Sequence, residues 1–214
     1  MGGSGSVEMV AVRHGETVWN LDGRQQGHLH SELTPLGVRQ AQAMAEGLAG
    51  EHFDALYSSD LGRAMQTAQI LAERLELDVR AEPGLRERHL GMLQGLTMAE
   101  FRERYPEHYA RLRSADADYV IPEGESARQR HRRCVRCAAE IAGRHPGGKV
   151  LVIAHGGVLN SFFRHALGLA VAGPRRFCLY NGSINRFRIE DGEWSLVSWG
   201  ETHHLRGIGT RDDW

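Results

Sequence analysis

The sequence lacks any apolar stretch long enough to cross a membrane, since none approaches the roughly 20 residues that a bilayer requires. Its net charge is only -1, so neither a nucleic acid nor a membrane surface is an expected partner. It has three cysteines, an odd number that does not suggest a disulfide framework. Residues 1–6 lack the basic and apolar regions of a signal peptide. These absences together predict a cytoplasmic protein.

The composition is that of an ordinary globular protein, with 25% charged and 41% hydrophobic residues among 214. This length suits one domain. We expect a single domain over residues 7–214, preceded at 1–6 by a Gly/Ser-rich flexible tail or cloning remnant. The sequence has no repeat and no linker that would separate two domains. The irregular stretch at about 83–122 is interpreted as a helical insertion that covers a site.

Predicted strands and helices alternate along most of the chain. The strands are expected at 7–12, 53–58, 78–81, 149–154, 177–179, 183–189 and 194–199. The helices are expected at 35–48, 61–75, 126–144 and 158–167, with shorter helical pieces at 98–105 and 108–113. Thr34 and the pair Ser59-Asp60 are expected to cap two of them. This alternation predicts an α/β fold, a three-layer α/β/α sandwich with a mostly parallel central sheet.

Polar residues follow the ends of three predicted strands. Arg13 and His14 come directly after the first strand. Arg63 lies in the first helical turn after the second, and His155 with Gly156 follows the strand at 149–154. Ligands of open α/β sheets bind at this edge, where helix N-termini also favour anions. Any one of these residues alone is more often structural, but together they predict a site for a phosphoryl dianion.

Four motifs in this order resemble the histidine phosphatase superfamily, which has the phosphoglycerate mutase-like fold. They are Arg-His-Gly-Glu-Thr at 13–17, Ser-Asp-Leu-x-Arg-Ala-x-Gln-Thr at 59–67, Leu-Arg-Glu at 85–87 and Ala-His-Gly-Gly at 154–157. The first motif alone is weakly specific, and the four together are strongly specific. The resemblance extends over about 7–199.

The resemblance implies a metal-independent phosphomonoester hydrolase without a cofactor. His14 is implied to attack phosphorus and become a phosphohistidine, and Glu87 to act as general acid and then base. Arg13, Arg63 and His155 are implied to bind the phosphoryl oxygens. Further contacts to the phosphate or substrate are implied for Asn20, Gln26, Gly27 and Gly156. To attack, His14 needs one unprotonated ring nitrogen, so its other nitrogen should donate to a fixed acceptor.

The segment 87–96 resembles its counterpart in the mutases of this superfamily, with two departures. The mutases carry a tyrosine at the position of Leu90 and a lysine at that of Met98, and those groups bind phosphoglycerate. Gln26 also matches the phosphatase branch better, and the chain is shorter than a typical cofactor-dependent mutase. We therefore predict hydrolysis of a small phosphorylated metabolite. The alternatives are a cofactor-dependent phosphoglycerate mutase and a non-catalytic phospho-ligand-binding module.

Other signals are given structural interpretations. Cys134 and Cys137, with His131 upstream, have metal-like spacing, but no second pair exists and packing in the core is favoured. Four arginines of the insertion are expected to form an exposed face, or alternatively to reach a substrate carboxylate: Arg102, Arg104, Arg111 and Arg113. No metal site is predicted. The expected partner is a small-molecule phosphate ester, and a homodimer is left open.

Overall fold

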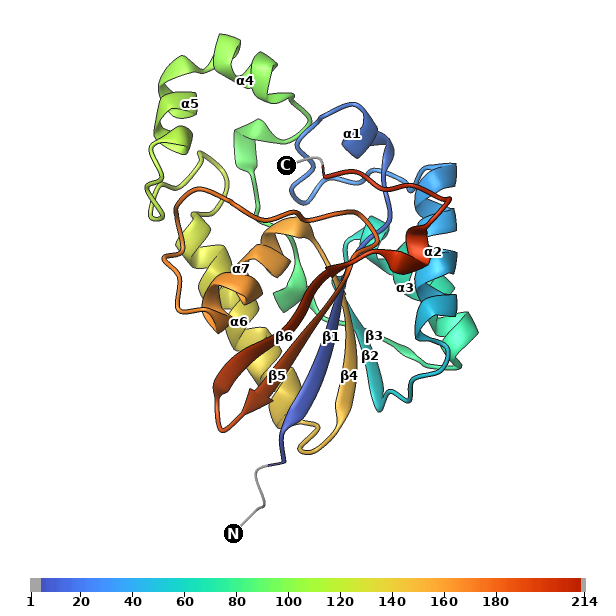
Figure 1. Ribbon diagram of the computed structural model, residues 1–214. Helices are drawn as coiled ribbons and strands as arrows, with labels where there is room; N and C mark the ends of the chain where they lie inside the picture. Colours follow the sequence, from blue (N-terminus) through green and yellow to red (C-terminus); the bar gives the residue numbers. More distant parts are fainter. Residues whose placement is uncertain (1–4, 213–214) are drawn as a thin grey trace.

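A six-stranded sheet, in the order β3-β2-β4-β1-β5-β6, forms the centre of the molecule (Figure 1). The computed structural model describes residues 5–212, so residues 1–4 of the predicted tail and residues 213–214 lie outside the described part. The strands are β1 (Val7–Arg13), β2 (Ala55–Ser58), β3 (Val79–Ala81), β4 (Lys149–Ala154), β5 (Ile184–Glu190) and β6 (Glu193–Glu201). The first four strands in the sheet order are parallel, and β5 and β6 pair antiparallel.

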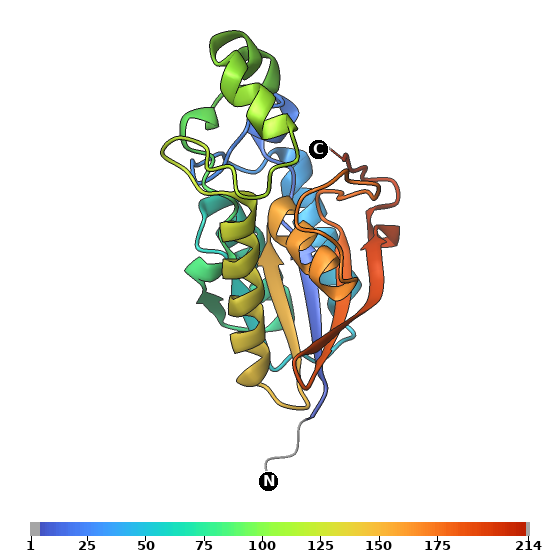
Figure 2. The ribbon, with the colours of Figure 1, turned by 90° about the vertical axis from the view of Figure 1, so that its left-hand side faces the viewer.

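Four long helices cover the two faces of the sheet, and Figure 2 shows one pair in front of it. They are α2 (Pro35–Leu48) and α3 (Gly62–Leu75) on one face, and α6 (Ala127–Gly143) and α7 (Gly156–Ala166) on the other. Each face encloses its own hydrophobic core, because β1, β2 and β4 alternate their buried side chains between the two layers. The predicted three-layer sandwich with a mostly parallel sheet is confirmed.

The strand order brings three strand ends to one edge of the sheet. Arg13 of β1 is paired in register with Ala154 of β4, and Ser58 of β2 is paired with Ile153 beside it. The residues that follow β1, β2 and β4 are therefore neighbours in space although they are far apart in the sequence. The backbone hydrogen bonds between β1 and β4 continue beyond the end of β1, since the His14 N–H donates to Ala154 O at 3.1 Å.

The segment between β3 and α6 lies beyond this edge of the sheet (Figure 1). It contains α4 (Met98–Arg104), α5 (Pro106–Arg113) and two 3-10 turns, Pro83–Leu85 and Gly91–Leu93. It has a small core of its own, formed by Leu93, Phe101, Tyr119 and Ile121. A third 3-10 turn, His203–Leu205, lies near the C-terminus. In the part of the chain from residue 5 to 212, no helix is long and apolar enough to span a membrane.

The predicted third-last strand, 177–179, does not form. Its backbone carries no ladder bonds, and Leu179 O instead accepts a hydrogen bond from Arg13 Nη1. A short helix, α1 (Val18–Leu21), was not predicted, although Thr17 and Asn20 form the capping box that starts it. Helix α7 begins two residues earlier than expected, which places His155 at its N-cap.

The expected caps were right for α2 and wrong for α3. Thr34 Oγ1 accepts the Gly37 N–H at 3.0 Å, with proline at the first position of α2. Helix α3 has no side-chain cap, because the Asp60 carboxylate pairs with Arg86. Cys134 and Cys137 pack in the core between the sheet and α6, which confirms the structural interpretation of that pair.

Candidate active site

His14 is buried at the end of β1, at 3% exposure, with a defined partner at each ring nitrogen. Nδ1 lies 2.7 Å from Gly15 O, which can only accept, so this nitrogen carries the proton. Nε2 lies 3.3 Å from Arg63 Nε, which can only donate. Burial, and then the charges of Arg63 and Arg13, hold the pKa of His14 well below its ordinary value. The residue therefore presents a neutral imidazole with a lone pair on Nε2.

Close backbone packing holds this strand end in place. A Cβ at Gly15 would lie 2.3 Å from Gly37 O, and a Cβ at Gly37 would lie 2.0 Å from Glu16 O. Both positions therefore need glycine for the loop after β1 to reach the start of α2. The Gly15 N–H also donates to Thr67 Oγ1 of α3 at 3.2 Å. The backbone that bears His14 is thus fixed from two helices.

Two buried arginines lie against His14. The Arg63 guanidinium donates to Gly27 O at 2.9 Å and to Leu29 O at 3.2 Å, which orients its fork. Burial lowers the pKa of Arg63 to about 10, so it remains a cation at neutral pH. Arg13, at the last position of β1, donates to Leu179 O. Two fixed cations beside one neutral imidazole form a site suited to a dianion.

His155 lies next to His14, with their ring centroids 5.2 Å apart. Its Nε2 is 2.8 Å from Ser59 Oγ, and that hydroxyl already accepts the Leu61 N–H at 3.3 Å. Because a hydroxyl can donate while it accepts, this contact allows the tautomer of His155 that carries its ring proton on Nδ1. Within residues 5–212, Nδ1 is buried without a hydrogen-bond partner. Burial and the charge of Arg63 hold the pKa of His155 well below its ordinary value, so its ring is neutral.

Two backbone amides hold the Glu87 carboxylate. Oε2 accepts the Gly157 N–H from the start of α7 at 2.7 Å, and Oε1 accepts the Arg88 N–H at 2.7 Å. A Cβ at Gly157 would lie 2.1 Å from Oε1, so only glycine allows this approach. The backbone of Glu87 is fixed as well, since its carbonyl accepts from His28 Nε2 at 2.8 Å and from Arg133 Nη2 at 3.2 Å.

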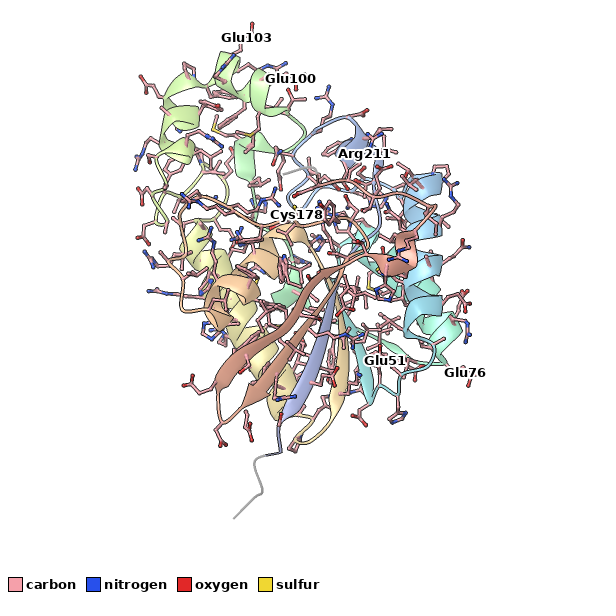
Figure 3. The ribbon with its side chains drawn as sticks, viewed as in Figure 1. Glu51, Glu76, Glu100, Glu103, Cys178 and Arg211 are labelled. Carbon is pink, nitrogen blue, oxygen red and sulfur yellow. The ribbon has the colours of Figure 1, made fainter. Side chains whose placement is uncertain are left out.

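These groups open onto a cavity of about 420 Å³. Its far wall comes from α1, the loop after it, and the segment of α4 and α5, and it includes Trp19, Leu90, Met98 and Leu112. Arg24 also lines the cavity, but its guanidinium forms an ion pair with Glu100 of α4, at 2.9 Å. Glu100 is labelled in Figure 3. In the described chain, no group of three or more His, Cys, Asp or Glu side chains is placed to hold a metal ion.

The structure brings the nine residues singled out by sequence together. Eight of them line the cavity, and His155 lies directly beside His14. Asn20 lines the cavity while its side chain also caps α1. Gln26 lines it with a buried Oε1 that has no hydrogen-bond partner within residues 5–212. Of the four insertion arginines, all are exposed and only Arg113 lines the cavity.

Sequence reasoning missed several residues of the site. Ser59 binds His155, and Asn181 donates to His14 O at 3.2 Å from the loop before β5. Arg88 and Arg130 line the cavity from the loop after Glu87 and from α6. The position of Ser59 directly after a strand was a usable signal. Nothing local distinguishes Arg130 from the other arginines of its helix.

A model of the histidine phosphatase superfamily (branch 1) matches residues 9–202. The chain is similar to the metal-independent phosphoserine phosphatase of Arabidopsis thaliana, with 41% identity over 206 residues that cover 95% of this chain and 85% of that protein. Phosphoglycerate mutase-like protein 4 of the same plant is also 41% identical, over 207 residues covering 95% and 89%. The solved structure of Bacillus stearothermophilus YhfR has a TM-score of 0.87 at 27% identity, covering 93% of this chain and 99% of that one.

The chain belongs to the histidine phosphatase superfamily, as its four motifs predicted. Within that family it is a phosphatase, a phosphoric monoester hydrolase.

Proposed function

We propose that the protein hydrolyses a small phosphate monoester in two steps, through a phosphohistidine on His14. The observation that carries this proposal is the pair of contacts on the His14 ring. With Nδ1–H held by Gly15 O, the lone pair on Nε2 is available as a nucleophile. In the first step Nε2 bonds to phosphorus as the bond to the leaving oxygen breaks. In the second, water bonds to phosphorus, the P–N bond breaks, and inorganic phosphate leaves.

Charge on the transferred phosphoryl group is neutralised by fixed donors. Arg63 Nε points at His14 Nε2, so a phosphoryl group placed there meets this guanidinium directly. Arg13 supplies the second cation, and His155, in the tautomer with its proton on the buried Nδ1, supplies a neutral donor that a phosphoryl oxygen would satisfy. Donors held in a buried site stabilise developing charge without reorganising during the reaction. The proposed reaction therefore uses these protein donors, and not a metal ion, to neutralise the phosphoryl charge.

Glu87 is the proposed proton donor to the leaving oxygen and the base for the attacking water. Two amides, from Arg88 and Gly157, keep its carboxylate at the cavity wall. Leu90 and Met98 also line the cavity, where the mutases place a tyrosine and a lysine. This apolar lining supports hydrolysis over transfer to a second phosphoglycerate. The name of the plant relative makes phosphoserine the first substrate to test.

A rapid-quench experiment with ³²P-labelled phosphoserine tests the proposal. We expect an acid-labile, base-stable label on the wild-type chain, and no label and no turnover in His14→Ala. His52→Ala is the matched control, because His52 is exposed away from the cavity. A variant His14→Ala with normal turnover would exclude the proposed nucleophile. A wild-type chain that binds phosphate esters but hydrolyses none, including p-nitrophenyl phosphate, would favour the binding module instead.

A further inference from the structure

A buried arginine of α6 lines the cavity and forms no ion pair with a described carboxylate. Arg130 is 5% exposed, and its Nε donates to Ser161 Oγ at 3.2 Å. Neither of its terminal nitrogens has an acceptor among residues 5–212, and no described carboxylate lies within ion-pair distance of it. The Glu87 carboxylate is nearby across Gly157 but makes no ion pair with Arg130, so an anion that bonds to its terminal nitrogens would lower the cost of burying this cation. Arg24 at the rim differs, because Glu100 already neutralises it.

A second cation lies close to Arg130. Arg88 donates Nε to Glu125 O at 2.8 Å and Nη2 to Tyr119 O at 3.1 Å, and both acceptors are neutral carbonyls. Burial and the nearby charge of Arg130 lower the pKa of Arg88 to about 10. Arg88 and Arg130 thus form a cationic part of the cavity wall. Neither arginine forms an ion pair with a described residue.

The position of Arg130 relative to Glu87 indicates which part of a substrate it meets. A Cβ built on Gly157 would lie 2.1 Å from Glu87 Oε1 and 2.7 Å from Arg130 Nη1, so both atoms flank the same glycine. In the proposed reaction Glu87 serves the leaving oxygen. A group bound by Arg130 is therefore carried by the leaving alcohol, a few bonds from that oxygen.

We propose that Arg130, assisted by Arg88, binds a carboxylate on the leaving-group part of the substrate. The preferred substrates are then phosphate esters of small hydroxy acids or hydroxy amino acids. This inference rests on the proposed hydrolysis and adds its specificity. Arginine suits the task because its planar fork matches a carboxylate with two parallel hydrogen bonds. The mutases bind phosphoglycerate with groups at the positions of Leu90 and Met98. Arg130 would bind a carboxylate from a different element, α6.

Two substrates that differ only at the carboxylate test this assignment. 3-Phosphoglycerate and glycerol 3-phosphate share the ester and the neighbouring hydroxyl, and only the first has the carboxylate. The measurement is the ratio of their kcat/KM values in the wild type, Arg130→Met, Arg130→Lys and Arg132→Met. Arg132 is the matched control, an exposed arginine of the same helix that does not line the cavity.

We expect the wild type to favour 3-phosphoglycerate, and Arg130→Met to lower the ratio by about 10- to 100-fold, the usual value of a hydrogen bond to a charged group. Arg130→Lys should retain part of the preference, and Arg132→Met should retain all of it. An unchanged ratio in Arg130→Met overturns the inference. Equal losses on both substrates also overturn it, because Arg130 would then act on the phosphoryl group. Failure of the wild type to hydrolyse any ester refutes the proposed function instead.

Discussion

Replacing Gly157 with alanine should displace the Glu87 carboxylate while leaving the fold intact. The new Cβ would lie 2.1 Å from Glu87 Oε1, so the carboxylate must retreat by roughly 1 Å, and a misplacement of that size costs on the order of 10²-fold in rate. The hydrogen bond from Gly157 N–H to Oε2, 2.7 Å long, would also lengthen. The free energy of unfolding should change little, because alanine is favoured over glycine in a helix by about 1 kcal/mol and this gain offsets the cost of displacing Glu87.

The assay is the single-turnover rate of phosphoenzyme formation with glycerol 3-phosphate and with p-nitrophenyl phosphate. The first substrate has a poor leaving group and no carboxylate, so its rate reports on proton donation without the charge of Arg130. We expect a loss of about 10²-fold for Gly157→Ala on glycerol 3-phosphate and a much smaller loss on p-nitrophenyl phosphate.

Gly143→Ala is the matched control for this variant. Gly143 ends α6, and a Cβ there meets no atom within 4 Å. We expect wild-type rates and a gain in unfolding free energy of about 0.5–1 kcal/mol. A wild-type rate for Gly157→Ala on glycerol 3-phosphate would refute the reasoning. Equal losses on both substrates would mean that the substitution damages the whole cavity.

Three further outcomes are expected. Glu87→Gln should slow phosphoenzyme formation from an alkyl phosphate by about 10²–10⁴-fold and from p-nitrophenyl phosphate much less. Equal losses would show that Glu87 only positions groups. The pKa of His14 and of His155 is lowered in the folded state, so the unfolded chain binds more protons, and the free energy of unfolding should fall as pH decreases from about 7 to about 5. His14→Gln should flatten that slope by up to about 1.4 kcal/mol per pH unit in denaturant titrations, and parallel slopes would contradict this. EDTA should leave turnover intact and vanadate should inhibit it, whereas a loss in EDTA that a divalent ion restores would indicate a required metal.

Local sequence patterns predicted a central strand of the sheet and one of the helices that cover it. The valine-rich run of β1 and the Thr34-Pro35 start of α2 each have one strongly favoured local structure. The Asp191-Gly192 pair between β5 and β6 is typical of a two-residue hairpin turn, and both residues have the positive φ that such a turn requires. These features depend on neighbours a few positions away, so a single sequence reveals them.

Predictions failed where a distant partner takes a polar group. Leu179 O bonds to Arg13 Nη1 across the molecule, so 177–179 does not pair as a strand. Asp60 pairs with Arg86 rather than capping α3, and Ser59 binds His155. Local propensity cannot anticipate these partners, because tertiary contacts select among structures that differ little in intrinsic preference.

The sequence by itself determined the layered fold and the residues at its strand ends. Alternating strands and helices dictate parallel pairing, and parallel strands bring their carboxyl ends, with His14 and His155, to one edge. Only the tertiary structure decided what surrounds them. The Gly157 amide that binds Glu87 and the Arg63 contact at His14 Nε2 join residues that are 70 and 49 positions apart, and Arg130 is held in the cavity wall by Ser161, 31 positions away. Those properties arise from distance and from exclusion of water, which residue types and spacing do not encode locally.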